Sequence, residues 1–379
     1  MFSDSQLCLQ FSKHVADIIF IIKVVLGCVG VLASLFVMLL IGIMKVYKQF
    51  VYRLVLYLMA VNTLQALFQI LELIPIEVTE NNNVLVRNGT GWQEVCLVVG
   101  YLDIGVVWMG NLVIVWTMLY MLSLSWQLNR LQQAGHRIDR EVQPDWTARV
   151  GEIVGLLFVI CGPFLFNWIP FVVHMYGPSD FMCWIKTVGK SGCGNNIKLQ
   201  HWSIGLMAAL FYGPMVAIVT FGLVCFLAII LLLHRTSKHL HGGIKQRYQS
   251  SMKEMGMLLV YPLIYSLFCT IMLATRIYTF VHPESNDHSP FYPLWILHSV
   301  ADPGRIVLPA LAFLLHPYVW KTFLRQSTCP CRSPDDAISA YTKYSVPPED
   351  SDIDEGITIQ PTGDDYGSVN NGVFFNKPN

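Results

Sequence analysis

The sequence predicts an all-α membrane protein built as a bundle of seven transmembrane helices. Of its 379 residues, 54% are hydrophobic and only 13% are charged, whereas soluble domains carry about 25% charged residues. The apolar residues also gather in seven runs, and a helix of about 20 residues crosses a hydrocarbon core about 30 Å thick. A chain this poor in charge, with runs this long, is expected to cross a membrane several times.

Each of the seven runs is expected to be a helix, because hydrocarbon offers no partner for an unpaired backbone N–H or C=O group. The first run is too long for the apolar part of a signal peptide and no small-residue cleavage site closes it, so it is kept as the first helix. The runs leave little room for a separate soluble domain. They cover residues 18–44, 51–76, 96–125, 150–173, 204–233, 256–281 and 291–315.

The two ends of the chain differ from the membrane domain, residues 18–315. Residues 1–17 form a short N-terminal segment. At the other end, residues 334–379 hold 2 of the 25 Lys and Arg residues and 9 of the 25 Asp and Glu residues. A segment rich in Asp, Glu, Ser, Pro and Gly and poor in aliphatic residues is typical of disorder. Residues 329–379 are therefore expected to be a disordered, acidic cytoplasmic tail.

The distribution of basic residues predicts that the N-terminus lies on the outer side of the membrane. Short cytoplasmic loops carry an excess of Lys and Arg. With the N-terminus outside, the four inner segments hold 2, 4, 5 and 3 of these residues, and the four outer segments hold 1, 1, 3 and 0. The sequon Asn88-Gly89-Thr90 then falls in an outer loop, so Asn88 is expected to be glycosylated.

Four cysteines fall in segments assigned to the outside: Cys8, Cys96, Cys183 and Cys193. Disulfides persist in that environment, and four cysteines allow three pairings. Cys96 opens the third helix and Cys183 lies in the long loop between the fourth and fifth, so a bond between them would tie this loop over the mouth of the bundle. We expect this pair to be bonded, with free thiols as the alternative, while the pairing of Cys8 and Cys193 stays open.

A short amphipathic helix is expected over residues 316–328, after the last apolar run. Its apolar residues recur at helical spacing with Lys321 and Arg325 between them, which is typical of a helix lying in the membrane interface among lipid headgroups. Cys329 and Cys331 follow it and are candidates for palmitoylation. The alternatives are a metal site or plain thiols, but no neighbouring His or Cys completes a metal cage.

Ionisable residues inside a membrane are costly and often mark a functional site. We expect the outer halves of the helices to form a polar pocket for a small ligand. The mixed charges suit an anionic or zwitterionic ligand, with the guanidinium of Arg276 as the anion partner. The alternative is that these charges only hold the helices together. The candidate ligand-binding residues are Glu72, Asp103, Arg276 and His298, with His174 at the rim.

Further ionisable residues lie in the membrane runs, among them Asp302, Arg305 and Lys23. Asp302 and Arg305 are deeper than the outer set and three residues apart, so they share one face of a helix and can pair directly. Their expected role is an intramembrane pair that holds helices together. Lys23, in the first run, is long enough to extend its ammonium group to the outer headgroups.

Taken together, these features resemble the G-protein-coupled receptor superfamily over about residues 18–325. They are seven helices with the N-terminus outside, a Cys opening the third helix, a Cys in the second outer loop and an amphipathic helix after the seventh. Within the superfamily, the chain is most similar to the cyclic-AMP-receptor-like branch, which borders the secretin and adhesion receptors. The motifs that carry this likeness are Cys183-Trp184-Ile185, Phe211-Tyr212-Gly213-Pro214, Tyr261-Pro262-Leu263-Ile264-Tyr265, Leu297-His298 and Pro303-Gly304.

The sequence departs from rhodopsin-like receptors, which end the third helix with Asp/Glu-Arg-Tyr and carry Asn-Pro-x-x-Tyr in the seventh. Here the third run ends in Leu122-Ser123-Leu124-Ser125-Trp126. Pro309 and Phe313 stand where the cyclic-AMP-receptor-like pattern has an Asn and a Tyr, so the activation switch also departs from that pattern. The N-terminal segment is too short for the extracellular domains of secretin and adhesion receptors.

The resemblance implies a receptor of the plasma membrane that transduces a small, polar extracellular ligand into heterotrimeric G-protein signalling. No enzymatic activity, cofactor, metal or nucleic-acid partner is expected. The alternative is a multi-pass transporter for a small polar solute, which would show repeated halves and short broken helices, and neither is evident. A retinal protein is disfavoured because residues 291–315 contain no Lys, and a zinc hydrolase because His298, His316 and Asp302 are too few and lie at different depths.

The inner loop 234–255 is the expected contact with the G protein. It joins two helices that Pro214 and Pro262 interrupt. An outward swing of the sixth helix would open a groove for an amphipathic helix, and the C-terminal helix of a G-protein α subunit is the partner that the resemblance implies. The alternative is that the basic residues of this loop only fix topology. They are Arg235, Lys238, Lys245, Arg247 and Lys253.

The acidic tail is expected to be regulatory. Phosphorylation by kinases would add negative charge and recruit a basic partner such as an arrestin. A passive, solubilising tail is the alternative. The candidate acceptor residues are Ser333, Ser339, Thr342, Ser345, Ser351, Thr358, Thr362 and Ser368.

Overall fold

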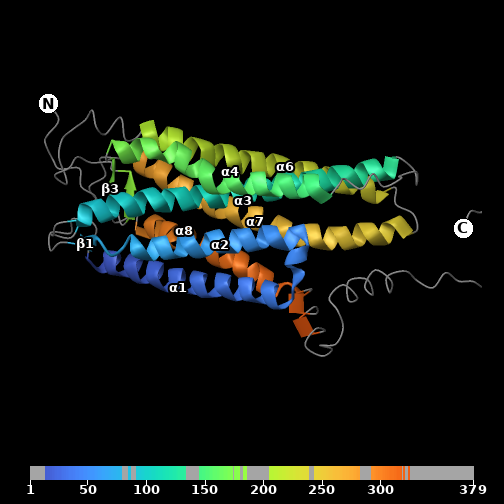
Figure 1. Cartoon of the computed structure of the whole chain (residues 1–379). Coiled ribbons are helices and arrows are strands. Elements are labelled where there is room, and N and C mark those ends of the chain that lie inside the picture. Colours follow the sequence, from blue (N-terminus) through green and yellow to red (C-terminus); the bar gives the residue numbers. More distant parts are fainter. Residues whose placement is uncertain are drawn as a thin grey trace, which may run out of the picture.

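Long helices lie side by side in an elongated bundle (Figure 1). This arrangement comes from a computed structural model. It describes residues 13–78, 84–86, 91–133, 145–173, 175–179, 182–185, 205–238, 243–281, 292–317, 319–320 and 323–324. The long helices are α1 (Lys13–Ile43), α2 (Phe50–Leu71), α3 (Trp92–Gln133), α4 (Asp145–Val172), α6 (Gly213–Lys238), α7 (Gly243–Val281) and α8 (Tyr292–Leu315).

Six helices in the described part of the chain are long and apolar enough to cross a membrane. They indicate a multi-pass membrane protein, which confirms the predicted helical membrane bundle at this coarser level. The six do not include α8, whose 24 residues carry His298, Asp302 and Arg305. The spans are Asp17–Ile43, Phe50–Leu71, Trp92–Gln127, Arg149–Val172, Gly205–Arg235 and Leu258–Tyr278.

Several helices continue past the apolar runs that predict them. The third run ends at residue 125 but α3 continues to Gln133, and the sixth run begins at residue 256 but α7 begins at Gly243. Apolar runs mark only the part of a helix that lies in hydrocarbon. Beyond it, residues such as Leu, Gln, Lys, Met and Glu are good helix formers in water. Most of the expected inner loop 234–255 is therefore helical.

Two short β-hairpins lie at the end of the bundle where α1 begins (Figure 1), which we call the hairpin end. Strands β1 (Ile76–Val78) and β2 (Val84–Val86) pair antiparallel, with Ile76 opposite Val86. Strands β3 (Tyr176–Ser179) and β4 (Met182–Ile185) pair with Tyr176 opposite Ile185. The expectation of helices alone missed both hairpins, because strands of three or four residues leave little periodic signal.

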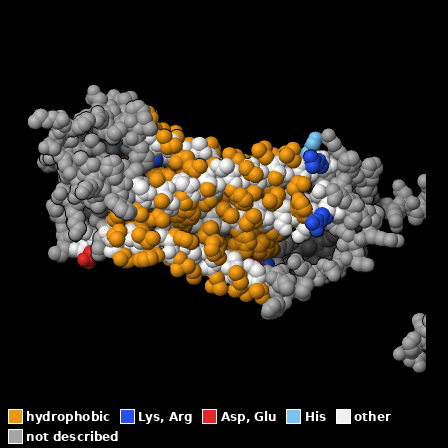
Figure 2. All heavy atoms as spheres, turned by 90° about the horizontal axis from the view of Figure 1, so that it is seen from above, with side chains coloured by type: hydrophobic (Ala, Val, Ile, Leu, Met, Phe, Trp, Pro, Cys, Tyr) orange, Lys and Arg blue, Asp and Glu red, His pale blue; other side chains and the backbone are white. Residues whose placement is uncertain are grey.

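The outer surface of the bundle is apolar, as lipid requires. In the view of Figure 2, hydrophobic side chains cover the middle of the molecule, and Lys and Arg side chains gather mainly at the end opposite the hairpins. Helices α1, α4 and α6 expose large side chains such as Leu32, Leu165 and Val224. Apolar side chains that point inward from the helices of the bundle form the core, among them Val37 of α1 and Val113 of α3.

A π-helical turn, η2 (Ala208–Tyr212), precedes α6. Gly213 donates its backbone N–H to the carbonyl of Ala208, five residues earlier. A β-carbon at Gly213 would lie 2.8 Å from that oxygen, so the widened turn requires glycine. Pro214, which has no N–H to continue a regular ladder, follows directly. Such π-turns often occur at functional sites, and this one places Phe211 against the β3–β4 hairpin.

The chain turns away from the bundle axis after α8 (Figure 1). Of the expected amphipathic helix 316–328, the described residues include Pro317, Val319, Trp320, Phe323 and Leu324, which are helical. Val319 is buried and Leu324 is exposed, and the indole N–H of Trp320 donates to the carbonyl of Leu314 at 2.5 Å. The tail, residues 329–379, lies outside the described residues.

Candidate functional site

Ionisable side chains from four helices and the end of a fifth gather inside the bundle, toward the hairpin end. Each is at most 8% exposed, although most residues of these types lie in water. They come from α1, the end of α2, α3, α7 and α8. We call them the buried charge cluster: Lys23, Glu72, Asp103, Arg276, His298, Asp302 and Arg305.

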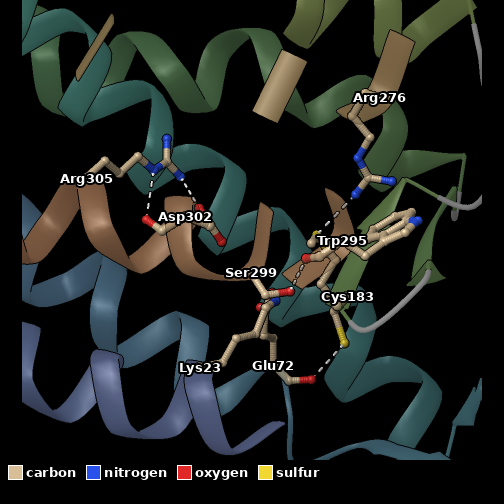
Figure 3. A network of polar contacts seen from close by, with 9 residues as sticks. Lys23, Glu72, Cys183, Arg276, Trp295, Ser299, Asp302 and Arg305 are labelled. Carbon is tan, nitrogen blue, oxygen red and sulfur yellow. Dashed lines mark hydrogen bonds and ion pairs between the residues drawn. The ribbon is translucent and has the colours of Figure 1, made fainter. Parts of the chain in front are cut away.

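Lys23 and Glu72 form one ion pair of the cluster. The Lys23 Nζ lies 2.9 Å from the Glu72 Oε1, and each side chain is only 2% exposed. Lys23 therefore does not extend to the outer headgroups, and the expectation that it would is wrong. Glu72 directly follows α2 at its C-terminal end, so the pair ties α1 to α2 near the hairpin end (Figure 3).

Asp302 and Arg305 form the second pair. The Arg305 Nη2 donates to the Asp302 Oδ1 at 2.8 Å, and the Arg305 Nε donates to the Asp302 carbonyl at 3.3 Å. The predicted pairing across one helical turn of α8 is thus confirmed (Figure 3). The side-chain amide of Gln65, on α2, faces the same guanidinium, and with its oxygen turned inward it accepts from Arg305.

Arg276 and His298 both lie against the ring of Trp295. The Arg276 guanidinium carbon lies 5.1 Å from the centre of the Trp295 ring, within the range of a cation–π contact. Its Nη2 also lies 3.8 Å from the sulfur of Met182 in β4, so Arg276 contacts the second hairpin. The His298 ring centre lies 5.7 Å from that of Trp295, and its Nδ1 has no hydrogen-bond partner among the described residues.

Asp103 differs from the other acids of the cluster. It is 5% exposed, and it forms no salt bridge or hydrogen bond within the described part of the chain. Lys23, Glu72, Asp302 and Arg305 lie close enough to act on it electrostatically. Asp103 therefore lies among charges without contacting any of them.

The β3–β4 hairpin packs into the mouth of the bundle. Its Cys183 is bonded to Cys96 of α3, with the two α-carbons 5.2 Å apart, as the sequence predicts. Tyr176 and Trp184 are at least nine-tenths buried, and burial raises the pKa of the Tyr176 phenol, with Tyr101 and Asp103 adding to the effect. The Cys183 sulfur lies 3.7 Å from the Glu72 carbonyl (Figure 3), so the hairpin closes over the cluster.

The hairpin also rests on the π-turn. The rings of Trp184 and Phe211 meet edge to face, with centres 4.6 Å apart, a favourable aromatic geometry. The Trp184 Nε1 has no partner among the described residues. A displacement of the hairpin would therefore move Phe211 in the π-turn that precedes α6.

A small cavity lies deeper, between α2, α3, α7 and α8, with space for about one water molecule. Asn62 and Tyr261 line it and keep polar atoms without a partner among the described residues. Arg305 and Tyr265 line it too, and the Tyr265 hydroxyl donates to the Asn111 side chain. The positions of charged residues in the sequence did not point to these uncharged polar residues. Their presence inside apolar runs was the available signal.

A third ion pair lies nearer the opposite end of the bundle. Arg53 of α2 holds Glu152 of α4 through two bonds of 2.6 and 2.8 Å, and the Tyr57 hydroxyl donates to the same carboxylate at 2.8 Å. A third nitrogen of Arg53 donates to the Lys48 carbonyl at 2.8 Å. This side chain thus joins α2, α4 and the turn η1 (Val46–Lys48).

Several predicted site residues lie outside what the structure describes. His174, Asn88, Cys329 and Cys331 are among them. Of the basic residues expected to contact a G protein, Arg235 is exposed near the end of α6. For the others, Lys238, Lys245, Arg247 and Lys253, only the helical backbone is described.

No family model and no curated protein matches this sequence. Among the described residues, no group of three or more His, Cys, Asp or Glu side chains is arranged to hold a metal ion.

Proposed function

We propose that this chain is a G-protein-coupled receptor of the plasma membrane, with α8 as the seventh crossing and the N-terminus outside. The observation that supports it most is the Cys96–Cys183 disulfide, which fastens the β3–β4 hairpin over one end of a helical membrane bundle. Beneath this cover lies a cluster of charges that a passive bundle does not need. In the proposal, the hairpin end is extracellular and carries the glycan at Asn88.

The proposed ligand is small, polar and anionic or zwitterionic. Arg276 is the leading contact, because it reaches both the hairpin, through Met182, and the ring of Trp295. A planar guanidinium suits carboxylate or phosphate groups. Since the hairpin covers the cluster, a ligand reaches it only when the hairpin shifts. The proposed contacts are Glu72, Asp103, His174, Arg276 and His298.

The signal is proposed to leave at the opposite end. The π-turn under Trp184 and the proline at 262 in α7 give α6 and α7 places to bend. The ends of these two helices away from the hairpins carry Arg235, Lys238, Lys245, Arg247 and Lys253, which would meet the acidic surface of a G-protein α subunit. Palmitoyl groups on Cys329 and Cys331 would hold the following segment at the membrane, and the tail would recruit kinases and arrestin.

A second-messenger screen tests the proposal. Cells expressing the chain are exposed to small anionic and zwitterionic molecules, with sensors for each class of Gα subunit and a parallel assay of solute uptake. An active compound is expected to lose potency by roughly tenfold or more on Arg276→Ala. Replacement of the five loop basic residues by Gln should reduce coupling at an unchanged surface level. Solute uptake without any G-protein signal would overturn the receptor in favour of a transporter.

A further inference from the structure

Around Asp103, the carboxyl groups of the buried charge cluster outnumber the cations. Glu72 is bonded to Lys23 and Asp302 to Arg305, so the two nearby cations are already paired. The charged groups facing Asp103 are Lys23 of α1, Glu72 at the end of α2, and Asp302 and Arg305 of α8, with the phenol of Tyr176 in β3. These groups contribute two cations and, with Asp103, three carboxyls. Arg276 is directed away, toward Trp295 and Met182.

The third carboxyl is buried away from bulk solvent. Asp103 is 5% exposed and its Oδ1 is fully enclosed without a partner among the described residues. On the same helix, Gly100 is in such close contact with the hairpin that an added β-carbon would lie 2.7 Å from the Cys183 carbonyl. An isolated buried carboxylate costs so much free energy that the group takes a proton instead.

We propose that Asp103 binds a proton when the β3–β4 hairpin is closed, and releases it to water when the hairpin opens. The proton comes from solvent and returns to it, so the step is a simple acid–base equilibrium. The closed state then holds one more proton than the open state, and lower pH favours closure by linkage. This inference does not depend on the receptor proposal, since it concerns only the bundle and its cover.

Infrared spectroscopy of the full chain in lipid nanodiscs tests the protonation. At neutral pH we expect the C=O stretch of a protonated carboxylic acid, which shifts in heavy water and is lost in Asp103→Asn. Glu94→Gln is the matched control, since Glu94 is an exposed acid on the same helix and its removal should leave the band in place. Persistence of the band in Asp103→Asn, or its absence from the natural chain, would overturn the proposal.

Thermal unfolding provides a second measurement. At neutral pH the natural chain takes up a proton at Asp103 when it folds, whereas Asp103→Asn does not, so the Tm of Asp103→Asn should equal or exceed that of the natural chain. Asp302→Asn removes the partner of Arg305 and should lower the Tm by roughly 5 °C or more. If Asp103→Asn lowers the Tm as much as Asp302→Asn does, Asp103 is ionised and the proposal is wrong. A Tm that rises with Na⁺ in the natural chain but not in Asp103→Asn would show a metal cation in the proton's place.

Hydrogen exchange tests the coupling between protonation of Asp103 and closure of the β3–β4 hairpin. Hydrogen exchange of the β3–β4 amides, corrected for intrinsic rates, should be slower at about pH 6 than at about pH 8. In Asp103→Asn the corrected rates should be equal at the two pH values. A pH dependence that survives this substitution would assign the effect to another group and overturn the coupling.

Discussion

At the scale of single residues, Lys23 and Glu72 show how a lipid-facing bundle holds charge. Both side chains are buried away from bulk solvent. Each provides the other with a charged hydrogen-bond partner, across a 2.9 Å contact. Such a pair adds little net stability compared with apolar residues, but breaking it is costly because one charge is left buried alone. Its role is to fix how α1 and α2 meet beside the hairpin.

Lys23→Met is expected to destabilise the bundle by about 3–5 kcal/mol, because Glu72 loses the cation that it contacts. The Tm followed by tryptophan fluorescence in detergent should fall, and the double variant Lys23→Met with Glu72→Gln should recover most of the loss. Lys45→Met is the matched control, since Lys45 is exposed in a turn. An unchanged Tm in Lys23→Met would show that the pair does not hold the two helices.

At the scale of elements, the β3–β4 hairpin and α3 fit closely. The disulfide fixes one point of contact, and the fit around Gly100 fixes a second. A β-carbon at Gly100 would lie 2.7 Å from the carbonyl oxygen of Cys183 and 3.0 Å from its carbon. Backbone atoms at such a distance cannot rotate aside as a flexible side chain can.

Gly100→Ala is therefore expected to cost about 1–3 kcal/mol, the range for overpacking a tight site, and to speed hydrogen exchange in the hairpin. Gly110→Ala, on the same helix, is the control. Its nearest neighbour would be the Val61 Cγ1 at 3.7 Å, an ordinary contact, and Ala favours helix over Gly. Equal stability of the two variants would mean that the hairpin does not sit tightly on α3.

At the scale of the whole molecule, the two ends of the bundle differ in chemistry. The hairpins and the buried charge cluster lie toward one end, and exposed basic residues, such as Lys45 and Lys48 after α1 and Arg235 near the end of α6, lie at the other. This asymmetry supports the proposed orientation, with the hairpin end outside, because basic residues stay on the cytoplasmic side.

Glycosylation at Asn88 checks this orientation. Digestion with peptide N-glycosidase should increase the gel mobility of the natural chain and leave Asn88→Gln unchanged. As a control, the double substitution Asp139→Asn with Glu141→Thr completes a sequon between α3 and α4, where no glycan is expected. A glycan on that control would reverse the topology.

Truncation after Arg332 tests the role of the tail. If phosphorylation of the tail recruits arrestin, the shortened chain should reach the surface normally but fail to desensitise or internalise. A full-length variant with the tail Ser and Thr residues replaced by Ala should behave in the same way. Normal internalisation of both variants would show that the tail is only a solubilising segment.

The sequence by itself determined the features that depend on local spacing. Apolar runs predict helices because the bilayer requires internally bonded backbone, and Asp302 and Arg305 meet because three residues make nearly one helical turn. The Cys96–Cys183 bond followed from the placement of the two residues beside the mouth of the bundle. The helix ends beyond the apolar runs were less predictable. Helices α3 and α7 continue past these runs, where hydropathy does not distinguish a helix from a loop.

Only the tertiary structure decided which distant side chains meet. Lys23 and Glu72 are 49 residues apart and Arg53 and Glu152 are 99 apart, and both contacts depend on how each helix is rotated and shifted against its neighbour. Sequence gives the face of a helix but not this rotation, which is set by the packing of all the side chains between helices. For the same reason, it could name Asp103 as a buried acid but not show that both nearby cations were already paired.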